Sequence, residues 1–462
     1  MLHPLRVALS LLVITGLAVA QQSQAPTMTG EPIVDSATVA RAAFARSSAA
    51  LRANDLARAR READRAAAAW PTQQAYQWQR VVVGVRMRDN ALVLDALTRY
   101  ADLGLGRDLT SDSALAQLAS LPSFRRVAAR HEANRAPLVR GRTVAVLPDS
   151  TFFPEGIDID PRSGLTYVTS VRHGTIAELT PRGDYVRELL PRSGVGLGAI
   201  LAVRVDAQRG VLWATMSAVP QAANYTPADS SRHTLLRLRL PEAEIDGRWD
   251  LPPSPNGHTL GDVAIGPLGD VFMTDSRDPV LYRLPADSLE QLQPIRHPLF
   301  RSLQGVAPAP GARVAFVADY SHGLLKVDVF SGEVIRLADA PGSTSLGCDG
   351  IAWHDGAIIA VQNGVTPARV MRFELDSTWT KIVRADVLDR NPAVADEPTI
   401  GTIVGDEFIY VANSQWEKYD ESGVRIPRTV LRRPVLVSVP LFRRGLSPGP
   451  VQSFLLVQAR LP

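Results

Sequence analysis

Two stretches of the chain, residues 261–275 (GDVAIGPLGDVFMTD) and residues 304–319 (QGVAPAPGARVAFVAD), repeat one pattern. Each has an apolar run, a turn centred on glycine, and a second apolar run that ends in aspartate. A repeat of about 43 to 60 residues made of hairpins, without helical periodicity, is typical of β-propeller blades. Six copies therefore predict a mainly β fold, a six-bladed β-propeller with a central channel. The weaker copies begin near Glu155, Gly198, Asp349 and Glu397.

The first third of the chain has a different periodicity. Between residues 36 and 136, alanine and leucine recur at helical spacing, with breaks at Asn54-Asp55 and at Trp70-Pro71. This pattern predicts helices that pair as hairpins, with further helices at about residues 74–88, 91–103 and 121–127. The region resembles tetratricopeptide-type repeats, which have small residues where helices cross and a proline after the second helix. We expect a small helical domain over 36–136, ahead of a propeller over 143–460. It would bind a peptide or protein, or simply pack against the propeller.

The N-terminus has the features of an export signal. Arg6 precedes an apolar run over residues 7–20, which ends in the small-x-small sequence Ala18-Val19-Ala20. The sequence therefore predicts a signal peptide at 1–20, a linker at 21–35, and a periplasmic or extracellular protein. No segment reaches the roughly 18 apolar residues of a membrane-spanning helix. The single cysteine, Cys348, has no partner for an internal disulfide and is expected to be a buried small side chain.

Charge is unevenly distributed. Residues 36–140 contain 17 arginines and nine acids, and this local excess either attracts acidic partners or forms a solvated surface. Aromatic residues are not interleaved with the arginines, as a stacking platform for nucleic acid would need. Together with the export signal, this argues against a nucleic-acid partner.

The ring of blades needs a closure. Residues 143–147 alternate like a strand, and in many propellers one terminus supplies a strand to the last blade. We expect this segment to pair with residues 436–439 or with residues 454–457, because closure removes an exposed sheet edge.

Residues 153–160 (FPEGIDID) and 164–170 (GLTYVTS) resemble the gluconolactonase, senescence marker protein and luciferin-regenerating enzyme family, and more loosely strictosidine synthase and paraoxonase. The resemblance extends over about residues 143–460 and implies a six-bladed propeller. In that family the channel of metal-dependent members holds one divalent cation, often calcium. Its ligands are the Glu of a Glu-Gly motif, two Asn, and the Asp of an Asp-Gly motif, all oxygen donors that suit a hard cation.

Only part of that ligand set is present. Glu155 and Asp349 match the two acids, Gln304 replaces the second Asn, and Gly261 replaces the first. The resemblance thus implies a metal site of Glu155, Gln304 and Asp349, with Asp349 also catalytic. Asp262, which follows Gly261, is expected nearby. The alternative is that these carboxylates are turn residues that bond to neighbouring backbone.

Two further residues are candidates for ligand binding together with Asp262. His258 precedes the third blade and could act as a base at the channel mouth, or be an exposed turn residue. Asn413 ends a second strand and either lines a pocket or only terminates the strand. Two functions remain open. The propeller binds a small molecule, a peptide or a protein in or over the channel, or it is a metal-dependent lactonase or esterase.

Overall fold

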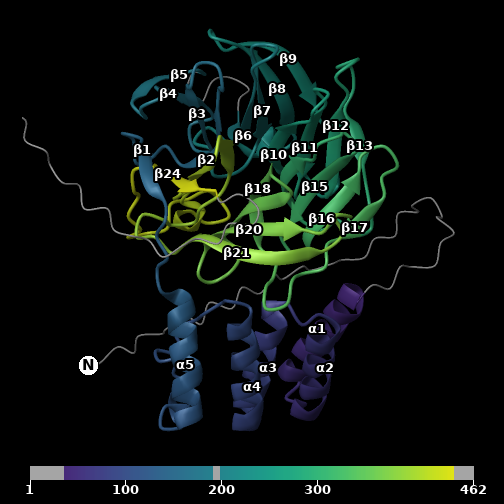
Figure 1. Cartoon of the computed structure of the whole chain (residues 1–462), viewed down its shortest axis with the longest axis vertical. Helices are drawn as coiled ribbons and strands as arrows, with labels where there is room; N and C mark the ends of the chain where they lie inside the picture. The colour runs from purple at the N-terminus through teal and green to yellow at the C-terminus, as the bar shows by residue number, and fades with distance from the viewer. Residues whose placement is uncertain (1–35, 191–197, 442–462) are drawn as a thin grey trace, which may run out of the picture. The chain divides into compact units, whose positions relative to one another are not determined.

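The computed structural model describes residues 36–190 and 198–441, which form five α-helices followed by 24 β-strands (Figure 1). The strands make six four-stranded antiparallel sheets, so the predicted six-bladed propeller is confirmed. The segments predicted as signal peptide and linker lie outside the described residues. Among the described helices, none is long and apolar enough to cross a membrane.

Each blade is an antiparallel meander. The first strands of neighbouring blades contact one another, so they surround the channel. Blade 1 is β2 (Pro154–Ile159), β3 (Thr166–Ser170), β4 (Ile176–Leu179) and β5 (Tyr185–Glu188); blade 2 is β6 (Ala199–Asp206), β7 (Val211–Ser217), β8 (His233–Arg239) and β9 (Glu244–Asp250); blade 3 is β10 (Leu260–Ile265), β11 (Val271–Asp275), β12 (Val280–Leu284) and β13 (Gln293–Ile295). Blade 4 is β14 (Leu303–Pro308), β15 (Val314–Asp319), β16 (Gly323–Asp328) and β17 (Val334–Arg336); blade 5 is β18 (Cys348–His354), β19 (Ala357–Gln362), β20 (Arg369–Leu375) and β21 (Ile382–Arg390); blade 6 is β22 (Gly401–Val404), β23 (Glu407–Val411), β24 (Val435–Pro440) and β1 (Arg142–Val146).

The sixth blade closes the ring with strands from both ends of the propeller. β1 pairs antiparallel with β24, with Thr143 opposite Val437. This is the first of the two predicted pairings; the second, with residues 454–457, lies outside the described residues. Because β1 covers β24, blade 6 reaches the same four strands as the other blades.

The helical region packs through small side chains. Ala40 and Ala63 are almost fully buried, which lets neighbouring helices approach closely, and Asp55 and Asp89 cap the second and fourth helices. The helices lie close to the predicted ranges, while their assignment as tetratricopeptide repeats stays a prediction. They are α1 (Ser36–Arg52), α2 (Leu56–Ala69), α3 (Gln74–Met87), α4 (Asn90–Asp102) and α5 (Pro122–Arg135).

The propeller core lies between blades. The Phe316 ring of blade 4, for example, stacks on Trp353 of blade 5 at a centroid distance of 5.4 Å. Cys348 belongs to the same apolar cluster and is fully buried, as expected from the sequence. Burial raises the pKa of its thiol, so the residue is an inert packing group.

Glycines let the first strands crowd together around the channel. A Cβ on Gly305 would lie 2.4 Å from the Asp349 carbonyl oxygen of the next blade, and one on Gly350 would lie 2.7 Å from the Cα of Ile400. No side chain fits at such distances. The Gln-Gly and Asp-Gly pairs therefore mark the points of closest approach, and the residue before each glycine lies at the channel.

Hydrogen bonds between the helices and the propeller go to loops of blades 4 and 5. The Arg369 guanidinium donates to the Gly104 carbonyl after α4 at 3.1 Å, and Thr72 donates to Asp339 at 2.6 Å. The start of a first strand pairs with the end of the second strand, as Leu303 does with Asp319. Loops before the first and after the second strands thus share one end of the channel, and the helices dock at that end.

Candidate functional site

A pocket of about 230 Å³ lies in the channel at the end where the first strands begin. Its polar lining combines carboxylates, amides and hydroxyls. The four residues predicted at the channel, Glu155, Asp262, Gln304 and Asp349, all line this one pocket. The remaining lining residues are Leu201, Thr259, Leu260, Gly261, Ser276, Tyr320, Asn363, Glu397, Ile400 and Trp416.

Glu155 is held by two donors from the loop after β23. Ser414 Oγ and the Trp416 indole nitrogen each donate to its Oε2 at 2.7 Å. Burial, and then the nearby Asp349 carboxylate, raise the pKa of Glu155 well above its ordinary value, despite these bonds. The two acids therefore line one confined site, as expected from the sequence.

Asp349 is oriented by an amide from its own blade. Asn363 Nδ2 donates to Asp349 Oδ2 at 2.7 Å and to the Pro398 carbonyl at 2.8 Å. Burial raises the pKa of Asp349 to about 7. The other amide atom, Asn363 Oδ1, is buried and has no hydrogen-bond partner among the described residues. An unsatisfied buried oxygen costs free energy unless a ligand binds it.

A third acid, Glu397, was not predicted as a site residue. It has a left-handed backbone with φ 63°, and its Oε2 accepts a bond from the Glu417 amide at 3.0 Å. Burial, and then the nearby acids, raise its pKa to about 8. A signal was present, because Glu397 begins the sixth copy of the repeat and stands near the position that Glu155 holds in the first.

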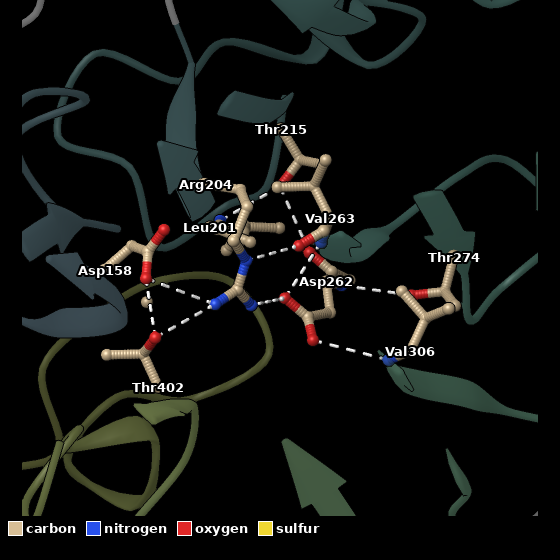
Figure 2. A network of polar contacts seen from close by, with 12 residues as sticks. Asp158, Leu201, Arg204, Thr215, Asp262, Val263, Thr274, Val306 and Thr402 are labelled. Carbon is tan, nitrogen blue, oxygen red and sulfur yellow. Dashed lines mark hydrogen bonds and ion pairs between the residues drawn. The ribbon is translucent and has the colours of Figure 1, made fainter. Parts of the chain in front are cut away.

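Asp262, which lines the pocket, belongs to a polar network centred on Arg204 of β6 (Figure 2). Its guanidinium lies between Asp158 of blade 1 and Asp262 of blade 3, at 3.4 and 3.3 Å, and Nε donates to the Val263 carbonyl at 3.1 Å. Thr402 of blade 6 donates to Asp158 at 2.6 Å. The network thus joins four blades. Nothing in the sequence distinguishes this arginine, apart from its place within an apolar strand.

Asp262 is fully engaged by this network and by backbone. Its Oδ1 accepts bonds from Arg204 and from the Val263 amide, and its Oδ2 accepts one from the Val306 amide at 3.3 Å. Burial raises its pKa, and Arg204 offsets part of the effect. Asp262 therefore lies at the pocket but has little capacity left for a ligand.

The other two predicted binding residues lie outside the pocket lining. His258 Nδ1 bonds to Asp275 at 2.5 Å, and Nε2 to the Pro252 carbonyl at 2.8 Å. Asn413 accepts from the Val435 amide at 2.7 Å and donates to the Arg433 carbonyl. Both therefore hold loops in the structure, and a role in ligand binding stays a prediction. Gln304 does line the pocket, and its Nε2 donates to Ser302 at 3.3 Å.

Three of the four acids that line the pocket have no cationic partner among the described residues, since only Asp262 pairs with an arginine. No described Lys, Arg or His forms an ion pair with Glu155, Asp349 or Glu397. No group of three or more His, Cys, Asp or Glu among the described residues is arranged to hold a metal ion.

No protein-family model matches the sequence, and no curated protein matches it either. The fold is similar to solved structures of gluconolactonase- and regucalcin-type propellers. A gluconolactonase from Xanthomonas campestris is 16% identical, over 67% of this chain and 93% of that chain, with a TM-score of 0.43. A calcium-binding regucalcin from Agrobacterium tumefaciens is 12% identical, over 65% and 96%, with a TM-score of 0.44. A virginiamycin B lyase from Staphylococcus aureus is 14% identical, over 60% and 82%, with a TM-score of 0.40.

Proposed function

We propose that the channel pocket binds a small oxygen-containing ligand together with one divalent cation, for which calcium is the best candidate. The observation that carries the proposal is that two acids, Glu155 and Asp349, line one pocket without a cationic partner among the described residues, together with Asn363, whose buried Oδ1 has no hydrogen-bond partner among them. A bound cation would remove the repulsion between the acids and supply the missing partner of the amide oxygen. Oxygen donors of this kind suit calcium, which also accepts water in open positions.

The proposed ligands are Glu155, Asp349 and Asn363, and the two acids are held in place by hydrogen bonds. Glu155 is fixed by Ser414 and Trp416, and Asp349 is fixed by Asn363. Gln304 was predicted as a third ligand and remains available as a further oxygen donor at the pocket. When bound, the cation would polarise a carbonyl or hydroxyl oxygen of the ligand.

The test is thermal unfolding with and without calcium. Calcium is expected to raise the melting temperature of the wild type, because a ligand that binds only the folded state stabilises it. Asp349→Asn and Asn363→Leu are expected to abolish the shift. The matched control Glu407→Gln removes a surface acid that pairs with Arg142, and it should keep the full shift. No shift in the wild type, or an equal shift in all variants, would remove the cation from the proposal.

A second candidate is hydrolysis of a lactone or ester in the same pocket. It is favoured by Asp349, a carboxyl that faces the pocket and is oriented by Asn363, as a base requires. Asp349 would take a proton from a water that adds to the carbonyl carbon, and return it to the leaving oxygen as the C–O bond breaks. A screen of lactones and aryl esters with calcium present tests this, and Glu397→Gln should alter the pH profile without abolishing turnover. If a lactone or ester binds but is not hydrolysed, only the first function, ligand binding, is supported.

We also propose that the chain is exported, on the basis of Arg6, the apolar run and Ala18-Val19-Ala20. N-terminal sequencing of the protein from its native host is expected to begin near Gln21. An intact Met1 on a cytoplasmic protein would refute export.

A further inference from the structure

One loop of the propeller exposes apolar side chains and unpaired arginines together. The loop comprises residues 424–433, between β23 and β24, and we call it the basic-apolar loop. Val430, Val424 and Ile426 are 73%, 60% and 39% exposed. Apart from the adjacent Tyr185 and Val186 on β5, the other exposed large apolar residues of the described chain lie at least five residues apart, and no other seven-residue stretch has three of them.

The arginines of the basic-apolar loop differ from most others on the propeller. All four are exposed, and none forms an ion pair with a described residue; they are Arg425, Arg428, Arg432 and Arg433. The loop itself contains no acid. Elsewhere on the blades, many exposed arginines pair with a nearby carboxylate, as in Arg142–Glu407, Arg248–Asp250 and Arg384–Asp386, while others, such as Arg162 and Arg182, stand singly without an ion pair among the described residues. The acids that precede the loop in the same connection, Asp420 and Glu421, form no ion pair with these arginines, so four exposed cationic side chains are clustered here without a paired carboxylate among the described residues.

The loop is held in shape rather than merely extended from the blade. The Ile426 amide donates to the Lys418 carbonyl at 2.8 Å, and the Arg425 guanidinium donates to the Thr429 carbonyl. At its base Tyr419 stacks on Phe153, with ring centroids 5.2 Å apart. The fold thus presents these apolar side chains to solvent in a fixed arrangement.

The loop emerges at the end of the channel that carries the pocket. Trp416 lies in the same β23–β24 connection and lines the pocket, and Tyr419 follows it by three residues. Whatever the basic-apolar loop contacts therefore also comes close to the pocket mouth.

We propose that the basic-apolar loop binds an anionic lipid surface. Apolar side chains that enter the boundary between headgroups and acyl chains, flanked by arginines that pair with lipid phosphates, are the chemistry of peripheral membrane binding. A soluble protein partner fits less well, because a stable interface takes 20 to 30 residues a side and the loop offers ten. The proposal is independent of the cation proposed for the pocket.

The experiment uses the purified full chain and vesicles that are sedimented at low salt. Vesicles of phosphatidylglycerol and phosphatidylcholine in equal parts are expected to bind the protein, and pure phosphatidylcholine is expected not to. Raising sodium chloride to about 0.5 M should lower the affinity at least tenfold, since salt screens exposed charges. Arg425→Gln combined with Arg428→Gln should lower it about 25-fold, at about fivefold for each arginine.

A second variant tests the apolar half of the surface. Val424→Ser combined with Val430→Ser should lower the affinity about tenfold, because two apolar side chains no longer leave water. The matched controls are Val383→Ser, on β21 and 54% exposed, and Arg52→Gln at the end of α1. Both controls should bind as the wild type does, and all variants should melt at the wild-type temperature.

Three results would overturn the proposal. Equal binding to neutral and anionic vesicles would show that the arginines do not contact the lipid. Equal losses of affinity in the loop variants and the control variants would show that the loop is not the binding surface. Absence of vesicle binding, with retention on immobilised poly-glutamate that depends on the loop arginines, would replace the lipid surface with an acidic protein partner.

Discussion

Replacing Asp349 with Asn should change how the stability of the protein depends on pH. Burial raises the pKa of Asp349 from 3.8 to about 7, which corresponds to at most about 4 kcal/mol of unfolding free energy. A carboxyl whose pKa is higher in the folded state binds protons more tightly there. Its contribution to stability is therefore complete below pH 3.8 and is lost as the pH rises through 7.

Between pH 5 and pH 8 this loss amounts to about 2 to 3 kcal/mol, and to roughly 3 °C in melting temperature for a chain of this size. Asn cannot ionise, and its side-chain oxygen can still accept the bond from Asn363 Nδ2. Without divalent cations, the Asp349→Asn variant should therefore overtake the wild type as the pH rises.

Chemical denaturation at four pH values between 5 and 8, with a chelator present, measures this difference. Equal pH dependence in the wild type and Asp349→Asn would refute the reasoning, because it would mean that Asp349 is already ionised at low pH. Adding calcium at pH 8 should restore the wild type and leave the variant unchanged.

Two further predictions concern the backbone and the network centred on Arg204. Gly305→Ala should lower the unfolding free energy by at least about 2 kcal/mol, because the new Cβ would lie 2.4 Å from the backbone of the next blade. Gly266→Ala is the control. Its Cβ would lie 3.0 Å from an aromatic side chain, so the loss of unfolding free energy should be smaller. Arg204→Met should lower the unfolding free energy by about 3 to 5 kcal/mol, because it leaves Asp158 and Asp262 buried without a counter-ion. Denaturant titration measures both, and a loss below about 1 kcal/mol for either would contradict the packing described.

The sequence was sufficient to predict the blades and part of the site. The repeat fixes the register of the first strands, so the residue before the glycine falls at the same register position in blades 1, 4 and 5. That regularity brought Glu155, Gln304 and Asp349 to one pocket. The ring closure was predicted from a different signal, the strand-like alternation of residues 143–147, and β1 does pair with β24.

The rest of the site comes from parts of the chain that the repeat does not determine. Asn363, Trp416 and Tyr320 follow second strands, in loops whose lengths differ from blade to blade. Arg204 is within a strand, and its partners are 46 and 58 residues away in sequence. His258 shows the opposite case. It was predicted to bind a ligand because it stands next to a strand end, but its side chain bonds to Asp275 and to its own loop.

We propose that Glu155, Asp349 and Asn363 together hold one divalent cation, and the position of that ion can be measured. Crystals grown with manganese, or soaked in it, would locate the ion directly by its anomalous scattering. We expect one strong peak in the channel, in contact with both carboxylates and with Asn363 Oδ1, and no such peak in crystals of Asp349→Asn. A channel without a peak in the wild type, or a peak that persists in the variant, would contradict the proposal.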